Sequence, residues 1–147
     1  MILLSIHPEY VEKIVSKVKT FEFRKLTPKD FNLDPRIAIY STRPMCRIVA
    51  YVEVSRILSG KPSGLWHRTS KWAGIDRTAF ETYFEGYVKG FAFEISKVHK
   101  LVRPITLNEA GYYSDAPQSF CYLTSSQVAK IVAAGKRTKT TSKRGVQ

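Results

Sequence analysis

The chain has 147 residues, of which 44% are hydrophobic and 24% are charged. This length and composition suit one globular domain with a substantial core, and they exclude a wholly disordered chain. The formal net charge of +12 favours an anionic partner, and nucleic acid is the commonest such partner of a strongly basic protein.

The first 25 residues predict a strand, a helix and a second strand. Residues 1–6 are typical of a strand, and Pro8 is tolerated in the first turn of the helix that follows. Four apolar residues recur there at helical spacing, which predicts a helix that packs by one face: Val11, Ile14, Val15 and Val18. Residues 19–25 then predict a strand that begins where this helix ends.

The strand at residues 19–25 has two contrasting faces, because alternate side chains of a strand point to opposite sides. One face is aromatic and carries a lysine at each end: Lys19, Phe21, Phe23 and Lys25. The other face is polar: Thr20, Glu22 and Arg24. Such a strand can anchor a core and present a polar site, or it can be a surface strand whose Glu–Arg pair contributes about 0.2–1 kcal/mol.

The middle of the chain predicts two strands and a helical insertion. Residues 36–42 form a strand that turns at Arg43–Pro44, and residues 47–58 form a long apolar strand that residues 59–62 interrupt. Residues 62–86 are then helical, with Asp76 as the N-cap of the second helix. That helix has an apolar stripe, expected in the core: Ala79, Phe80, Tyr83 and Phe84. We also expect Trp72 to be buried within the insertion.

The last third predicts a strand at residues 91–100, a short extended segment at 104–107 and a closing strand at 118–123. Thr124 and Gln127 fit a capping box, which predicts a final helix that stops at Gly135. Its apolar face would contain Val128, Ile131 and Val132.

Residues 1–135 are therefore expected to form one domain, followed by a basic tail at residues 136–147. The tail has no acid and five basic residues: Lys136, Arg137, Lys139, Lys143 and Arg144. It lacks apolar periodicity, which predicts disorder. Its charge could act as an electrostatic arm toward phosphates or could simply keep the protein soluble.

The cysteines and histidines show no pattern of metal ligands. Cys46 and Cys121 lie far apart in the sequence, and the three histidines are scattered. We therefore expect no metal and no cofactor. The chain also has no charged-then-apolar leader and no apolar run of membrane length, so we expect a cytoplasmic protein that does not bind membranes.

A series of short motifs, in one order across residues 2–123, resembles the ASCH domains of the PUA-like superfamily, and most closely the small stand-alone members described as predicted regulators. The motifs begin with residues 2–10 (ILLSIHPEY), Lys19-x-x-Glu22-x-Arg24, residues 39–44 (IYSTxP), Leu65–Trp66 and residues 73–75 (AGI). They continue with residues 83–86 (YFEG), 90–92 (GFA) and 116–120 (APQSF). The resemblance implies an α+β fold, a PUA-like mixed β-barrel with peripheral helices and a cleft for RNA or a nucleotide.

Several residues could serve such a cleft. Lys19 and Arg24 offer cationic donors to phosphate or to a base carbonyl, and Glu22 can accept from an exocyclic amine. Hydroxyls that follow a strand can hold a phosphate, and aromatic rings can stack on a base: Ser41 and Thr42, and Tyr40 and Trp66. The resemblance also implies that Gln118 and Ser119 lie beside the cleft.

Three functions remain open from the sequence. The first is a module that binds nucleic acid, RNA rather than DNA, or a single modified base. The second is a small hydrolase that acts on RNA or on a modified nucleoside, with Lys19 and Glu22 as the proton-transfer pair. Some ASCH proteins are amidohydrolases, but only Lys19 matches their three catalytic positions. The third is a protein-interaction adaptor.

Overall fold

The structure is a computed structural model that describes residues 1–136. Its centre is one six-stranded sheet with the strand order β2-β5-β4-β3-β1-β6. The strands are β1 (Ile2–Ile6), β2 (Phe21–Arg24), β3 (Arg36–Ser41), β4 (Arg47–Gly60), β5 (Gly90–Ile105) and β6 (Phe120–Tyr122). The helices are α1 (Pro8–Val15), α2 (Pro62–Thr69), α3 (Arg77–Phe84) and α4 (Ser125–Ala134), with 3₁₀ turns η1 (Phe31–Leu33) and η2 (Ser70–Trp72).

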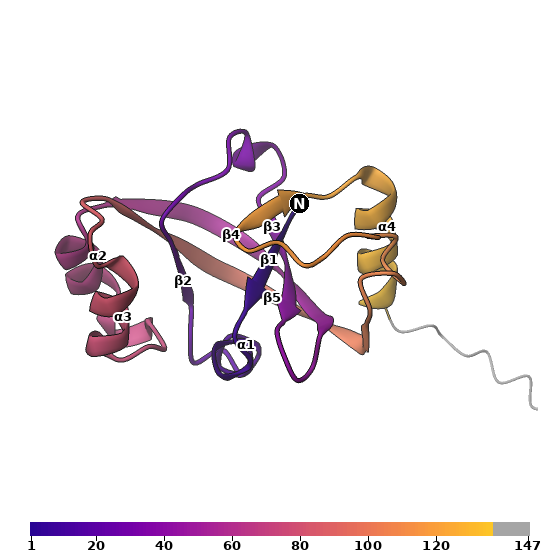
Figure 1. Ribbon diagram of the computed structural model, residues 1–147, viewed down its shortest axis with the longest axis horizontal. Coiled ribbons are helices and arrows are strands. Elements are labelled where there is room, and N and C mark those ends of the chain that lie inside the picture. The colour runs from indigo at the N-terminus through magenta and orange to yellow at the C-terminus, as the bar shows by residue number, and fades with distance from the viewer. Residues whose placement is uncertain (137–147) are drawn as a thin grey trace, which may run out of the picture.

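The sheet is mixed and curls into a half-barrel. β1 runs parallel to β3, whereas the other neighbouring pairs are antiparallel. Figure 1 shows the insertion with α2 and α3 at one end of the molecule and α4 at the other. The predicted α+β class with a mixed sheet and peripheral helices is confirmed.

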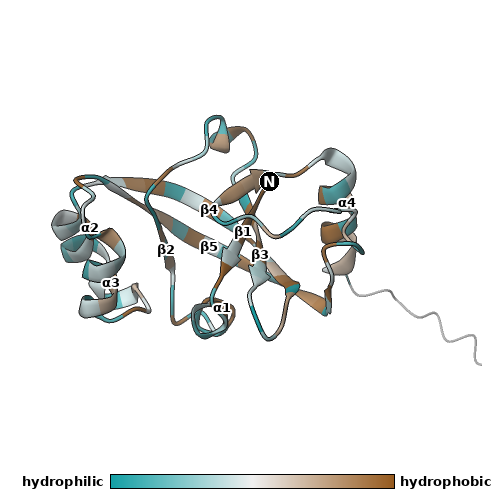
Figure 2. Ribbon diagram, viewed as in Figure 1, coloured by the Kyte–Doolittle hydropathy of each residue, from teal (hydrophilic) through white to brown (hydrophobic). Residues whose placement is uncertain are grey.

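Apolar side chains divide the core into three clusters, which the pleat of the strands explains. In β1, Ile2, Leu4 and Ile6 pack toward α1, while Leu3 points to the other face, toward α4. The third cluster lies between the helical insertion and the sheet, and includes Phe23 and Phe80. Figure 2 shows hydrophobic and hydrophilic residues interspersed along β4 and β5. The insertion is therefore packed on the sheet through a core of its own.

Two expectations about side-chain burial are wrong. α1 ends at Val15, so Val18 lies beyond the helix and is 60% exposed. Lys17 has a left-handed backbone with φ of 65°, which turns the chain out of the helix before Val18 is reached. Trp72 is 52% exposed rather than buried, because it lies in the η2 turn at the margin of the insertion, whose interior is filled by other side chains such as Leu65 and Phe80.

Both predicted helix caps are confirmed. The Asp76 carboxylate accepts a hydrogen bond from the backbone amide of Ala79 at 2.8 Å, at the start of α3. At the start of α4, the hydroxyl of Thr124 accepts from the Gln127 amide at 3.2 Å, and the Gln127 side chain accepts from the Thr124 amide at 2.9 Å. These bonds satisfy amides that a helix leaves without partners at its first turn.

The strand predicted at residues 91–100 is longer than expected. β5 continues to Ile105 and absorbs the short segment predicted at residues 104–107. It does so through irregular pairing with β4, where Ala50 opposes Lys100 but Ile48 opposes Ile105. Such a bulge bends a strand without ending it, and bulges leave little trace in apolar periodicity.

Two further findings concern residues 1–136 alone. No helix there is long and apolar enough to span a membrane. No group of three or more His, Cys, Asp and Glu side chains is placed to hold a metal ion. Of the predicted tail, residues 137–147 lie outside the described part of the chain.

Candidate functional site

A cavity of about 530 Å³ lies between β1 and β2, on the open side of the half-barrel whose edge strands are β2 and β6. We call it the seam cavity. Its walls come from β1, α1, β2, α3 and four single positions outside these elements. The lining residues are Ser5, Ile6, Tyr10, Glu22, Phe23, Arg24, Ala79, Thr82 and Tyr83, with His7, Lys19, Ile75 and Gln118 as the single positions. Segments that are distant in sequence therefore build one concave site.

The seam cavity reaches the edge of β1 because β6 is short. β6 pairs with β1 only as far as Leu4, so the free edge of β1 at Ser5 and Ile6 has no neighbouring strand. Nη2 of Arg24 donates instead to the Ser5 carbonyl at 3.0 Å, and the Ser5 hydroxyl donates to the carbonyl of Pro117 at 2.7 Å. Arg24 thus bridges β2 to β1 across the open side of the sheet and also lines the cavity.

Lys19 is a buried lysine in the wall of the cavity, with only 3% of its surface exposed. Its Nζ donates to the carbonyl of Ala73 and lies 4.9 Å from the ring centroid of Phe23 and 5.4 Å from that of Tyr10. None of the ion pairs among residues 1–136 includes it. Burial lowers the pKa of Lys19, and the nearby charge of Glu22 opposes that shift.

Gly74 allows Lys19 to pack so closely against the insertion. Gly74 has a φ of +62°, and a Cβ atom added there would lie 2.4 Å from Cβ of Lys19. A residue with a side chain would therefore push Lys19 away from the carbonyl of Ala73. The glycine in the AGI motif fixes the position of the lysine.

Glu22 and Arg24 form an ion pair that leaves one donor unused. Nε of Arg24 lies 3.5 Å from Oε1 of Glu22, and their side chains are only 14% and 12% exposed. This Nε atom is buried and has no hydrogen-bond partner among the described residues. An unsatisfied buried donor costs about 1–3 kcal/mol, so the site carries a polar group that a ligand could satisfy.

Two tyrosines complete the polar wall, and sequence reasoning missed both as site residues. Burial raises the pKa of Tyr83, and burial followed by the charge of Glu9 raises the pKa of Tyr10. Both hydroxyls are therefore neutral and able to donate at physiological pH. The spacing in α3 could have indicated Tyr83. Ala79 and Tyr83 are four residues apart and both line the cavity, whereas Phe80 and Phe84 fill the core.

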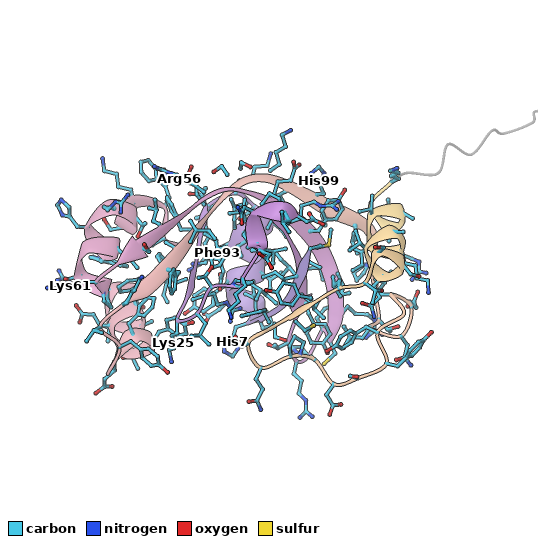
Figure 3. All side chains as sticks on the ribbon, turned by 90° about the horizontal axis from the view of Figure 1, so that it is seen from above. His7, Lys25, Arg56, Lys61, Phe93 and His99 are labelled. Atoms are coloured by element: carbon cyan, nitrogen blue, oxygen red, sulfur yellow. The ribbon has the colours of Figure 1, made fainter. Side chains whose placement is uncertain are left out.

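A lysine also lies over the rings next to the cavity. Nζ of Lys25 is 4.7 Å from the ring centroid of Tyr83 and 4.6 Å from that of Tyr87. Figure 3 labels Lys25, which follows β2, and His7, which follows β1, the two segments that flank the seam. Cationic side chains therefore extend from the wall of the cavity to its surroundings.

The structure brings together four of the nine predicted binding residues, Lys19, Glu22, Arg24 and Gln118, in the seam cavity. The other five do not line it. Tyr40 and Ser41 are buried, and the backbone amide of Thr42 donates to Ile6 at 3.1 Å. Trp66 packs in the insertion, 5.0 Å from the ring of Phe80, and Ser119 lies outside the lining.

The strand order explains why residues 40–42, which were expected at the cleft, do not line the seam cavity. β3 lies on the side of β1 that faces away from β2, so its end is separated from the cavity by β1 itself. Tyr40 points into the cluster beneath α4, where burial raises its pKa. The sequence motif IYSTxP therefore belongs to the sheet beside the seam cavity and not to its wall.

The chemistry of the wall combines cationic donors, one carboxylate, one amide and aromatic rings. This set can bind an anion next to a planar heterocycle, because the cations and hydroxyls suit phosphate and the carboxylate and amide suit base edges. Phe23 and Ile75 add apolar surfaces to the wall, which suit the faces of a base.

Comparisons with known proteins give a consistent result. No protein-family model matches the chain. It is 34% identical over 134 residues, 89% of each chain, to an ASCH domain-containing ribonuclease from Zymomonas mobilis. The crystal structure of an ASCH protein from Zymomonas mobilis superimposes with a TM-score of 0.82 at 32% identity, over 90% of this chain and 93% of that one. The fold expected from the resemblance is confirmed.

A more distant structure shares the fold alone. The N-terminal domain of McrB from Staphylothermus marinus matches with a TM-score of 0.60 at 9% identity, over 90% of this chain and 92% of that one. Its likeness shows that the curled mixed sheet recurs in a protein of very different sequence.

Proposed function

Because the chain belongs to the ASCH domain family, we propose that it binds RNA and receives an unpaired nucleotide in the seam cavity. The observation that carries this proposal is the pair of cations around one carboxylate, the buried Lys19 and Arg24, whose side chain is 14% exposed. Arg24 keeps a buried Nε without a partner. A nucleotide supplies acceptors for such donors, and burial strengthens each charge-assisted hydrogen bond that forms.

The surroundings of the cavity support an extended anionic ligand. The net charge of the chain is +12, and Lys25 lies over Tyr83 and Tyr87 beside the cavity. RNA is favoured over DNA because a similar protein is named a ribonuclease. Glu22 and the Tyr83 hydroxyl are groups that could bond a ribose 2′-hydroxyl, the group that distinguishes the two nucleic acids.

The test is a fluorescence-polarisation titration of the full chain with single-stranded RNA, single-stranded DNA and duplex DNA of matched sequence. Arg24→Ala should weaken RNA binding by roughly tenfold or more, as expected for hydrogen bonds to a charged group. The matched control is Arg56→Ala, which removes the same charge from an arginine whose side chain is 60% exposed and pairs with Glu94.

Thermal unfolding of both variants separates binding from folding. Arg24 bridges the seam, so some loss of stability in Arg24→Ala is expected, and binding is compared only where both variants are folded. If Arg24→Ala and Arg56→Ala bind RNA equally well, the Glu22–Arg24 pair has only a structural role and the proposed site is wrong.

A second candidate is a ribonuclease, which the name of the similar protein and the lowered pKa of Lys19 beside Glu22 both favour. In this scheme the 2′-oxygen forms a bond to phosphorus while Glu22 takes its proton. The bond from phosphorus to the 5′-oxygen breaks, and the Lys19 ammonium donates its own proton to that oxygen, which gives a 2′,3′-cyclic phosphate and a free 5′-hydroxyl. RNA cleavage that is unchanged in a folded Glu22→Gln variant would exclude this assignment.

A further inference from the structure

A second cavity, of about 300 Å³, lies where the end of α1 meets β5. We call it the basic cavity. Its polar lining consists of Lys17, Thr20, Ser96, Lys97 and His99, and Lys19 also belongs to its wall. Lys19 lines the seam cavity as well, so the two cavities share this residue.

The charge of the basic cavity is mainly positive, with three lysines in its lining and one carboxylate, that of Glu53, beside it. None of the residues that line it is acidic, and Lys17 and Lys97 join none of the ion pairs among residues 1–136. One carboxylate contacts the wall, since Oε2 of Glu53 lies 2.6 Å from Nε2 of His99. Glu53 also lies opposite Lys97 in the β4–β5 pairing, and its pKa is lowered by the hydrogen bond with His99 and by the charge of Lys97. No acid lies within ion-pair distance of Lys17 or Lys97 among residues 1–136.

The backbone conformation of Lys17 does not require a lysine side chain. Its φ of 65° is left-handed, a conformation that glycine adopts freely and that costs other residues about 1–2 kcal/mol. The turn that ends α1 depends on main-chain bonds, from the Lys17 amide to Ile14 and from the Val18 amide to Lys13, both at 3.0 Å. A glycine would make the same bonds, so the fold does not require a lysine side chain at this position.

We propose that the basic cavity binds the phosphate that adjoins the nucleotide in the seam cavity, so that a single RNA strand crosses Lys19. The inference rests on the proposed function and assigns it a second subsite. Lys17 and Lys97 would donate to the phosphate oxygens, and the hydroxyl of Thr20 lies in the same wall. The ligand is a phosphodiester group, which the basic cavity would bind through its negative charge and without regard to the base.

The test uses the full chain with a labelled single-stranded RNA, titrated over a range of salt concentrations. Each lost phosphate contact should reduce the slope of log affinity against log salt by about 0.7 for a single strand, so the Lys17→Gly, Lys97→Gln double variant should lose about 1.4. The matched control, Lys61→Gln, removes a charge at the far end of the molecule, where Figure 3 labels Lys61.

Lys17→Gly makes the test independent of misfolding. Glycine suits the left-handed turn, so its melting temperature should equal or exceed that of the wild type while RNA binding weakens. If the double variant retains the wild-type salt slope, the inference is overturned and the seam cavity stands alone. If the wild type itself does not bind RNA, the proposed function fails and the inference fails with it.

Discussion

At the scale of single residues, Lys19 is the residue that lines both the seam cavity and the basic cavity. It is buried, joins none of the ion pairs within residues 1–136 and is held by the Ala73 carbonyl and two aromatic rings. Buried lysines of this kind lose protons more easily than exposed ones, because a low-dielectric environment disfavours the charged form. Its protonation therefore affects stability as well as ligand binding.

The lowered pKa of Lys19 predicts a pH dependence of stability with a definite sign. Between that lowered value and the ordinary value of 10.5, the unfolded chain binds more protons than the folded protein. The free energy of unfolding should therefore rise with pH across this window. Lys19→Met lacks this titration, so the stability of the wild type relative to Lys19→Met should increase as the pH rises toward the ordinary lysine pKa of 10.5.

Chemical denaturation at several pH values measures this difference directly. Lys61→Met, at an exposed lysine, is the control, and its free energy of unfolding should change with pH in parallel with that of the wild type. Parallel curves for Lys19→Met as well would show that Lys19 titrates in the folded protein as it does in the unfolded chain.

Sequence reasoning reached part of the site at this scale. Glu22, Arg24 and Gln118 reach the seam cavity from the motifs that predicted them, and so does Lys19. Strand alternation would have placed Lys19 on the face opposite Glu22, but β2 begins only at Phe21, so alternation does not apply to it. Tyr10 and Tyr83 were missed because helical spacing shows which face is apolar and not which strand will lie opposite.

At the scale of secondary-structure elements, the helical insertion builds one wall of the seam cavity. Residues 61–89 connect β4 to β5, and Phe80 and Phe84 of α3 pack against β2 through Phe23 at 4.9 and 6.4 Å. The same helix presents Ala79, Thr82 and Tyr83 to the cavity. One face of α3 thus fixes the insertion on the sheet while its neighbouring positions remain available to a ligand.

Within residues 61–89, which connect β4 to β5, Gly74 is the position most sensitive to substitution. Gly74→Ala should destabilise the protein by about 1–2 kcal/mol from its left-handed backbone alone, before the displacement of Lys19 is counted. RNA binding should weaken in the same variant. Gly64→Ala is the matched control, because Gly64 lies within α2 with open space around it, and alanine there should add up to about 1 kcal/mol of stability.

Thermal unfolding and RNA titration of these two alanine variants check the prediction. A Gly74→Ala variant as stable as the wild type would mean that Lys19 does not depend on the close approach at Gly74.

At the scale of the whole molecule, local signals predicted the elements but not their arrangement. Caps, helical spacing and apolar runs identified most helices and strands, because these depend on residues that are near in sequence. Nothing local in β1 shows that it lies between β3 and β6, parallel to one and antiparallel to the other. The family resemblance implied a barrel with a cleft but not the order of its strands, so residues 40–42 were expected at the cleft although β1 lies between them and the seam cavity.

The charge of the tail gives a prediction for the full chain. Truncation after Lys136 removes four basic residues, Arg137, Lys139, Lys143 and Arg144. Affinity for RNA should fall and its salt slope should become shallower, while the preference among base sequences stays unchanged, because phosphate contacts carry no sequence information. The measurement is the same polarisation titration with two RNA sequences. A changed sequence preference would mean that the tail takes part in recognition.

The position of the insertion has a consequence for how such proteins diversify. The connection between β4 and β5 is closed at its base by the Gly60–Gly90 pair and carries its own apolar cluster. Its length and sequence can therefore change during evolution without altering the register of the six strands. Since one wall of the seam cavity belongs to this connection, relatives could acquire new ligand preferences by exchanging a single segment while the scaffold is inherited intact.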